Sequence, residues 1–233
     1  MSGLPGLSLV FWVALACALL PFAGVHVAYW LSESAGHVPS CFPYLDSCTS
    51  ISATGRHPPA SFVFRATMLP SAMLMMVHWL LHAQFLRETG HSMRRYFSIV
   101  VLGVTASLGL ILYVTVLGEI GDLLRTQRRI GTVLFFSFTF LAQLLLASTL
   151  RKMSEQIALG ASKTGKRMLI VCQVMLAIGV CSVAVQAYDP DLHDRIEDAV
   201  EWQLALLLQL NFLLSALYWK RSDWRLGFVK PKA

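Results

Sequence analysis

The sequence predicts an all-α fold, an integral membrane bundle of six transmembrane helices with both termini cytoplasmic. Of its 233 residues, 56% are hydrophobic and only 14% are charged, and the mean hydropathy is +0.61. Soluble domains are less apolar than this. Six apolar runs are long enough to cross a hydrocarbon core of about 30 Å, which takes roughly 20 residues of helix. The predicted spans are residues 7–31, 61–86, 97–117, 130–150, 168–187 and 199–219, in a single domain covering residues 1–233.

These runs are predicted to be helices because a lipid environment leaves no water to satisfy the backbone, and they are too uniformly apolar for the alternating strands of a barrel. The first run also exceeds the core of a signal peptide, which is about 7–15 residues long. We therefore expect it to remain in the protein as the first helix.

The distribution of the 19 Lys and Arg residues indicates the orientation. Most of them lie in the second and fourth connections and in the C-terminal tail, which share one side of the membrane. Cytoplasmic segments are enriched in Lys and Arg, so this side is predicted to be cytoplasmic. The formal net charge of +6 then belongs mainly to one membrane face and gives no reason to expect nucleic-acid binding. The basic residues expected on the other face are Arg56, Arg65, Arg125, Arg128, Arg129 and Arg195.

The first outer connection, residues 32–60, contains Cys41 and Cys48, the only two of the five cysteines outside the predicted spans. In an oxidising compartment they could form a disulfide that stabilises a short loop by roughly 2–3 kcal/mol. The alternative is a pair of free thiols. Their spacing matches no specific metal motif.

Residues 51–65 lead from this connection into the second span. Gly55 and the pair Pro58-Pro59 oppose a helix, so we expect a shaped loop, with His57 and both prolines as candidate lipid contacts. Arg65 lies about one turn, or roughly 6 Å, inside the membrane boundary. Its guanidinium could extend to the headgroup region. Alternatively it binds a lipid phosphate or pairs with a carboxylate elsewhere in the bundle.

His78 and His82 are four residues apart and share one face of the second helix. A metal or haem site would need further ligands, and no other helix offers a histidine at the same depth. We therefore predict packing histidines, with no metal and no cofactor.

The sixth span begins with Glu201-Trp202. At 100° per residue, Glu201, Asn211 and Ser215 fall within an arc of about 80°, which predicts a polar stripe facing protein. With both termini cytoplasmic, Arg65 and Glu201 come to the same depth, and Glu119 and Arg128 lie near that level. We expect these charges and Trp202 to form a cluster under the Pro-Pro loop that holds a lipid headgroup or joins the second and sixth helices.

The loop pattern Ile-Ser-x-x-Gly-x-x-Pro-Pro-x-Ser, followed by Phe62-Val63-Phe64-Arg65, resembles the first outer loop of a family of small six-helix membrane proteins. That family includes the damage-regulated autophagy modulators (DRAM) and the post-GPI-attachment factor. Glu201-Trp202 is a second similarity. The resemblance implies roles in remodelling the lipid of GPI anchors, in autophagy or in membrane-lipid organisation. Some relatives carry a histidine near the start of the fourth helix, where this chain has Arg128 and Arg129.

The leading functional prediction is a protein that handles or senses membrane lipid, with the headgroup bound at the non-cytoplasmic face. One alternative is a lipid-modifying enzyme, an acyltransferase or hydrolase, with Glu201, His37 or His57 as base. Another is a non-catalytic membrane adaptor in autophagy. The expected partners are membrane lipids, with further membrane proteins or a second copy of the chain as open possibilities. The sequence carries no phosphate loop, nucleophile elbow or His-Glu-x-x-His motif and no targeting signal that would name a compartment.

Overall fold

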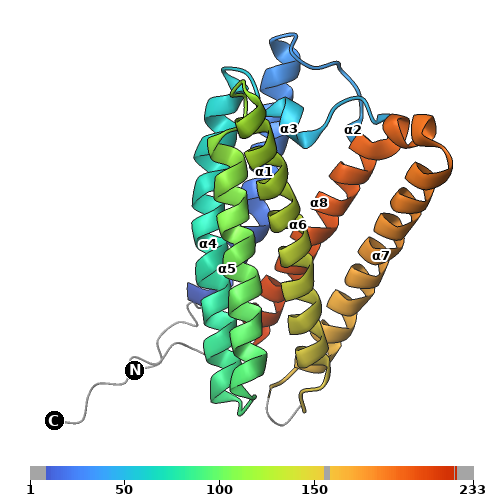
Figure 1. Cartoon of the computed structure of the whole chain (residues 1–233). Helices are drawn as coiled ribbons and strands as arrows, with labels where there is room; N and C mark the ends of the chain where they lie inside the picture. Colours follow the sequence, from blue (N-terminus) through green and yellow to red (C-terminus); the bar gives the residue numbers. More distant parts are fainter. Residues whose placement is uncertain (1–8, 155–157, 223, 225–233) are drawn as a thin grey trace.

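The computed structural model describes residues 9–154, 158–222 and 224. In this part of the chain six long helices form the bundle, and two short helices lie between the first two of them (Figure 1). The long helices are α1 (Leu9–Ser34), α4 (Ala60–Glu88), α5 (Met93–Thr115), α6 (Asp122–Arg151), α7 (Ala161–Tyr188) and α8 (Pro190–Arg221). The short ones are α2 (Pro43–Asp46) and α3 (Ile51–Thr54). All six long helices are apolar and long enough to cross a membrane, which confirms the six-helix prediction.

Several helices extend beyond the predicted spans into polar sequence. The acidic segment 189–197, which lies between the last two predicted spans, forms the N-cap and the first turns of α8. Asp189 caps this helix by accepting a hydrogen bond of 2.9 Å from the Leu192 backbone amide, and Pro190 occupies the first turn, where its missing N–H costs nothing. Likewise α6 already begins at Asp122, so Arg128 and Arg129 lie on a helix.

Neighbouring helices pack in a fixed order. α1 lies against α4 and α8, α5 lies between α4 and α6, and α7 contacts α6 and α8 (Figure 1). The described start of α1 and the end of α8 lie at the same end of the bundle, as an even number of spans requires. We call the opposite end, which carries α2 and α3, the outer end; that it faces away from the cytoplasm remains a prediction.

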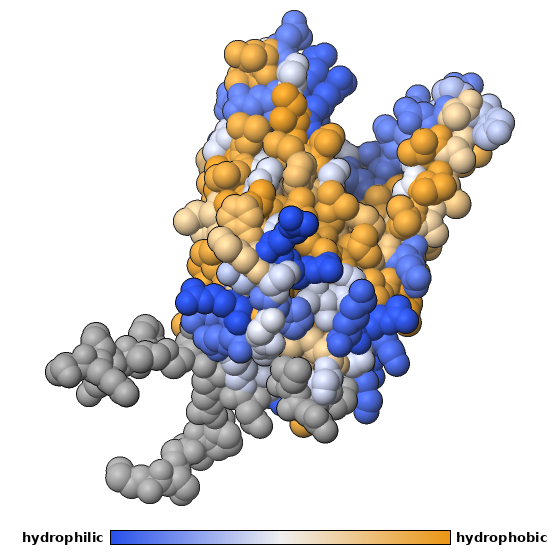
Figure 2. Space-filling model, turned by 60° about the horizontal axis from the view of Figure 1, so that its bottom comes forward, coloured by the Kyte–Doolittle hydropathy of each residue, from blue (hydrophilic) through white to orange (hydrophobic). Residues whose placement is uncertain are grey.

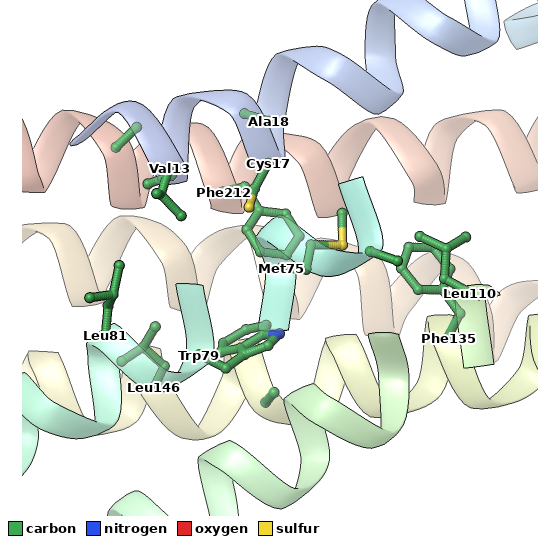
Figure 3. Close-up of a cluster of buried hydrophobic side chains, with 14 of the residues drawn as sticks. Val13, Cys17, Ala18, Met75, Trp79, Leu81, Leu110, Phe135, Leu146 and Phe212 are labelled. Carbon is green, nitrogen blue, oxygen red and sulfur yellow. The ribbon is translucent and has the colours of Figure 1, made fainter. Parts of the chain in front are cut away.

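The core lies where α1, α4, α6 and α8 meet. Trp79 and Phe212 are fully buried there, with their ring centroids 5.7 Å apart, and Met75 lies beside them (Figure 3). Gly103 on α5 makes room for the Trp79 ring, because a Cβ at this position would overlap the indole. A residue without a side chain is therefore required at this helix contact.

The polar stripe on α8 faces protein in its lower part, as predicted. Asn211 and Ser215 are buried. The Asn211 amide donates to Gln143 Oε1 at 3.0 Å, and Gln143 donates to the Leu208 carbonyl at 3.0 Å, so these bonds join α6 to α8. These bonds give the buried amide groups hydrogen-bond partners, which the lipid chains inside a bilayer could not provide.

α7 is the least buried of the six helices. Its buried residues all lie between Ala161 and Met175, and none lies beyond Met175. At the inner end the backbone of Gly165 packs directly on that of Arg151. The hydrophobic surface forms a belt between polar ends, and the outer end of the α7–α8 hairpin projects beside the rest of the bundle (Figure 2). On this side α2 contacts α8.

Candidate lipid site at the outer end

The connection between α1 and α4 folds over the outer end of the bundle, and we call residues 35–59 the cover. Cys41 and Cys48 form the predicted disulfide. Tyr29 at the end of α1 holds the same segment, because its hydroxyl donates to the Cys41 carbonyl at 2.8 Å and accepts from the Cys41 amide at 2.9 Å. The loop expected at residues 51–65 is partly helical, since α3 begins at Ile51 with Ser50 as its N-cap.

Three hydrogen bonds attach the cover to α8. Trp202 Nε1 donates to the Thr49 carbonyl at 2.8 Å, Gln203 donates to the Tyr44 carbonyl at 2.9 Å, and the Ala199 amide donates to Ser47 Oγ at 3.0 Å. Trp202 is only 1% exposed. Its first role is therefore to anchor the cover.

Arg65 pairs with Glu119, another member of the predicted cluster, rather than with Glu201. Its guanidinium donates to the Leu117 carbonyl at 2.6 Å and lies 3.5 Å from Glu119, so it joins α4 to the connection between α5 and α6. The side chains of Arg65 and Glu119 are 36% and 57% exposed, and such a pair contributes less than about 1 kcal/mol. Both contacts are made by one terminal nitrogen of Arg65 and reach the nearest loop rather than α8, while Arg65 Nε is buried without a hydrogen-bond partner in the described structure.

Glu201 lies between two hollows at the outer end. The upper one is an open depression of about 370 Å³ that also contains Ser52, Tyr113, Arg128 and Arg129. Arg128 is half-buried and Arg129 exposed, and within the described residues neither forms an ion pair with a carboxylate. Two cations without a partner in one depression attract an anion such as a phosphate.

The lower hollow is an apolar cavity of about 60 Å³ beneath the depression. Aromatic and aliphatic side chains of several helices line it, and Tyr113 and Glu201 border both hollows. Gln209 Oε1 lies buried at this cavity, without a hydrogen-bond partner in the described structure. An unsatisfied buried acceptor is costly for a protein alone and is met by a ligand that donates to it.

Tyr44 of α2 borders the apolar cavity from the cover. Its hydroxyl lies 3.1 Å from His26 Nε2, while His26 Nδ1 lies 2.7 Å from the Phe22 carbonyl. Because a carbonyl can only accept, Nδ1 carries the proton and Nε2 accepts from Tyr44. Burial raises the pKa of the Tyr44 hydroxyl, so it stays a neutral donor at physiological pH.

The remaining predicted site residues lie in the cover, away from both hollows. His57 stacks beside His37, with the ring centroids 4.8 Å apart, and His37 Nε2 lies 3.2 Å from the Pro58 carbonyl. None of His57, Pro58 and Pro59 borders the depression or the cavity. They shape the cover, and direct lipid contact by them remains a prediction.

The inner pair His78 and His82 is buried in the core. His82 Nε2 lies 3.1 Å from Ser215 Oγ, and His82 Nδ1 lies 3.0 Å from the His78 carbonyl. Both therefore act in helix packing here. Within the described part of the chain, one group has donor atoms close enough together for a metal ion, namely the partly exposed set His193, Asp194 and Glu197 at the start of α8.

The family model described as the Frag1/DRAM/Sfk1/Cwh43P N-terminal domain matches residues 9–219. The chain belongs to this family. The match runs from the start of α1 almost to the end of α8 and confirms the resemblance carried by residues 51–65 and by Glu201-Trp202. No curated protein and no solved structure matches the chain.

Sequence reasoning named Glu201, Trp202 and Arg128 but missed Arg129, Tyr113, Tyr44 and His26 as neighbours of the same hollows. Arg129 could have been identified from the sequence, because it directly follows Arg128 in a segment without enough carboxylates to pair every arginine. The other three lie on α1, α2 and α5, and only the packing of these helices brings them together.

Proposed function

We propose that this family member binds a membrane lipid with an anionic headgroup in the outer leaflet, with the phosphate beside Arg128 and Arg129. The observation that carries the proposal is the pair of unpaired arginines in a depression that opens directly above an apolar cavity. A phospholipid has the same two parts as this site, since its charged headgroup is joined to apolar chains. No soluble metabolite needs the apolar half of this site.

The carboxylate of Glu201 narrows the kinds of headgroup that this site would bind. It can accept hydrogen bonds from hydroxyl groups but repels a second phosphate, and Ser52 adds a further polar group on the same rim. A phosphate together with hydroxyls describes phosphatidylinositol and its glycosylated forms. These are also the lipids of GPI anchors, which the family resemblance implies as substrates.

Lipid retention tests this function. The purified protein is placed in phosphatidylcholine nanodiscs containing a minor fraction of phosphatidylinositol, and the bound lipid is identified by native mass spectrometry. We expect selective retention of phosphatidylinositol, and Arg128→Gln/Arg129→Gln should weaken it by about tenfold, which corresponds to ~1.4 kcal/mol.

Arg125→Gln is the matched control, because Arg125 is an exposed arginine on the same helix that borders neither hollow. It removes one positive charge without touching the depression. Equal loss in the control and the double variant would show a general charge effect. Unchanged retention in the double variant would refute the headgroup site.

The second candidate function is hydrolysis of a lipid ester. Glu201 lies where the depression meets the cavity, the level at which the ester bonds of a lipid bound this way would lie. As a base it would take a proton from water, and the hydroxide would attack the ester carbonyl. The ester C–O bond would break, and Glu201 would return the proton to the leaving alkoxide, giving a fatty acid and a lysolipid. Turnover of labelled lipid that Glu201→Gln abolishes supports the enzyme, whereas saturable binding without turnover supports the binding protein.

A further inference from the structure

A groove between α6, α7 and α8 has no role in the headgroup site. It is an open groove of about 450 Å³, and apart from Ser137 its walls are apolar, with Phe136, Phe140, Met175, Leu176, Val180 and Leu204 among them. Leu176 and Val180 on α7 are 56% and 59% exposed. The groove lies beside the part of α7 that begins at Met175, beyond which no described residue of this helix is buried.

This groove continues from the headgroup site. Phe136 borders both the apolar cavity and the groove. On α6, Arg128, Thr132, Phe136 and Phe140 follow one another at intervals of four residues, so they form a ridge that advances about 6 Å and turns about 40° at each step. The first two border the depression and the last borders the groove. This ridge thus leads from the arginines, about a third of a turn around α6, into the groove.

The length of this path matches one leaflet. Arg128 and Phe140 are separated by about 18 Å along the helix axis. Half of a hydrocarbon core is about 15 Å thick. A ligand anchored at the arginines and extending along this ridge therefore reaches the bilayer midplane.

We propose that the groove holds one acyl chain of the same phospholipid whose phosphate lies beside Arg128 and Arg129, and that the lipid enters sideways from the outer leaflet. The inference rests on the proposed function and adds the place of the tail and the route of entry. The cationic mouth at the outer end selects a lipid over an apolar helix, because a second protein helix would bring no charge to the arginines. The volume also lies within the range of about 300–1,000 Å³ that suits one small ligand.

Gly179 on α7 allows the groove to be filled without disturbing the protein. It borders the groove, and a Cβ added to it meets no atom within 4 Å. Gly179→Trp therefore places an indole in the space proposed for the chain. Ala177→Trp is the matched control, because Ala177 is exposed on the same helix, two residues away and on the opposite face, and does not border the groove.

The test uses phosphatidylinositol with a photoreactive diazirine in one acyl chain, in phosphatidylcholine nanodiscs. After irradiation, crosslinked peptides are mapped by mass spectrometry. We expect labels on the groove-facing residues of α6 and α7, a drop of about tenfold in this labelling for Gly179→Trp, and no drop for Ala177→Trp. Unchanged elution and melting temperature show that both variants fold.

Failure of the tail site and of the headgroup site are distinguishable. If Arg128→Gln/Arg129→Gln abolishes retention but Gly179→Trp leaves the labelling unchanged, the acyl groove is refuted and the headgroup site stands. Labels spread over the outer surfaces of α4 and α5 also overturn the groove. So do crosslinks between two copies of the chain through α7, which would assign the groove to self-association.

Discussion

Replacing Trp202 by Phe should release the cover from α8 while leaving the bundle folded. The indole N–H is the donor to the Thr49 carbonyl, and both residues are buried, at 1% and 4% exposure. Phe keeps an aromatic ring beside Tyr29 and Tyr44 but cannot donate. The Thr49 carbonyl is then left buried without its partner, which costs about 1–3 kcal/mol. At about 2 kcal/mol, local opening of the cover becomes roughly 30-fold more frequent.

Hydrogen exchange measures this opening directly. The amides of α3, next to Thr49, should lose about 30-fold protection in Trp202→Phe, while the amides in the middle of α4 should keep theirs. Trp30→Phe is the control, since Trp30 lies near the same end but is 62% exposed. If α3 exchanges equally fast in the wild type and in Trp202→Phe, Trp202 does not hold the cover. If α4 loses protection as well, the cover and the bundle unfold as one unit.

Two further predictions concern the attachment of the outer end. Arg65→Gln should destabilise the protein by about 1.5–3 kcal/mol, because the Leu117 carbonyl loses a charged donor. Glu119→Gln should cost less than about 1 kcal/mol, because that ion pair is exposed. Equal shifts in the melting temperature of the two variants would contradict this ranking. Cys41→Ser/Cys48→Ser should cost about 2.5 kcal/mol from the loss of loop closure over seven residues of separation. The measurement is the rate of proteolysis within the cover, and a rate that stays at the wild-type value would argue against a stabilising role.

The membrane spans were predictable because lipid imposes a simple rule on the backbone. A run of apolar residues of sufficient length must form a helix, and this rule located all six. The ends of the helices were not predictable in the same way. The segment 189–197 is polar whether it is a loop or the start of α8, and only the cap formed by Asp189 and Pro190 distinguishes the two.

The depth of the charged residues along the bundle could be predicted, but which of them form ion pairs could not. Depth follows from the position of a residue along its helix, so Arg65 and Glu201 were correctly placed near the same end. Which residues touch depends on how each helix is rotated and tilted. The partner of Arg65 is Glu119, which lies in the connection between α5 and α6. The path of such a connection cannot be inferred from hydrophobic periodicity. For the same reason the groove beside α7 could not be foreseen, since tilt leaves no trace in an apolar sequence.

The hydrogen bonds of Asn211 and Gln143 join α6 and α8 below the groove, and Gly165 closes α6 against α7 at the inner end. The burial of α7 is thus concentrated in its inner half, and around its outer half the surrounding lipid or detergent has to supply what the chain does not. The choice of detergent or bilayer is consequently part of this protein's stability. A short-chain detergent that solvates the inner half well would leave the far half of α7 unsupported.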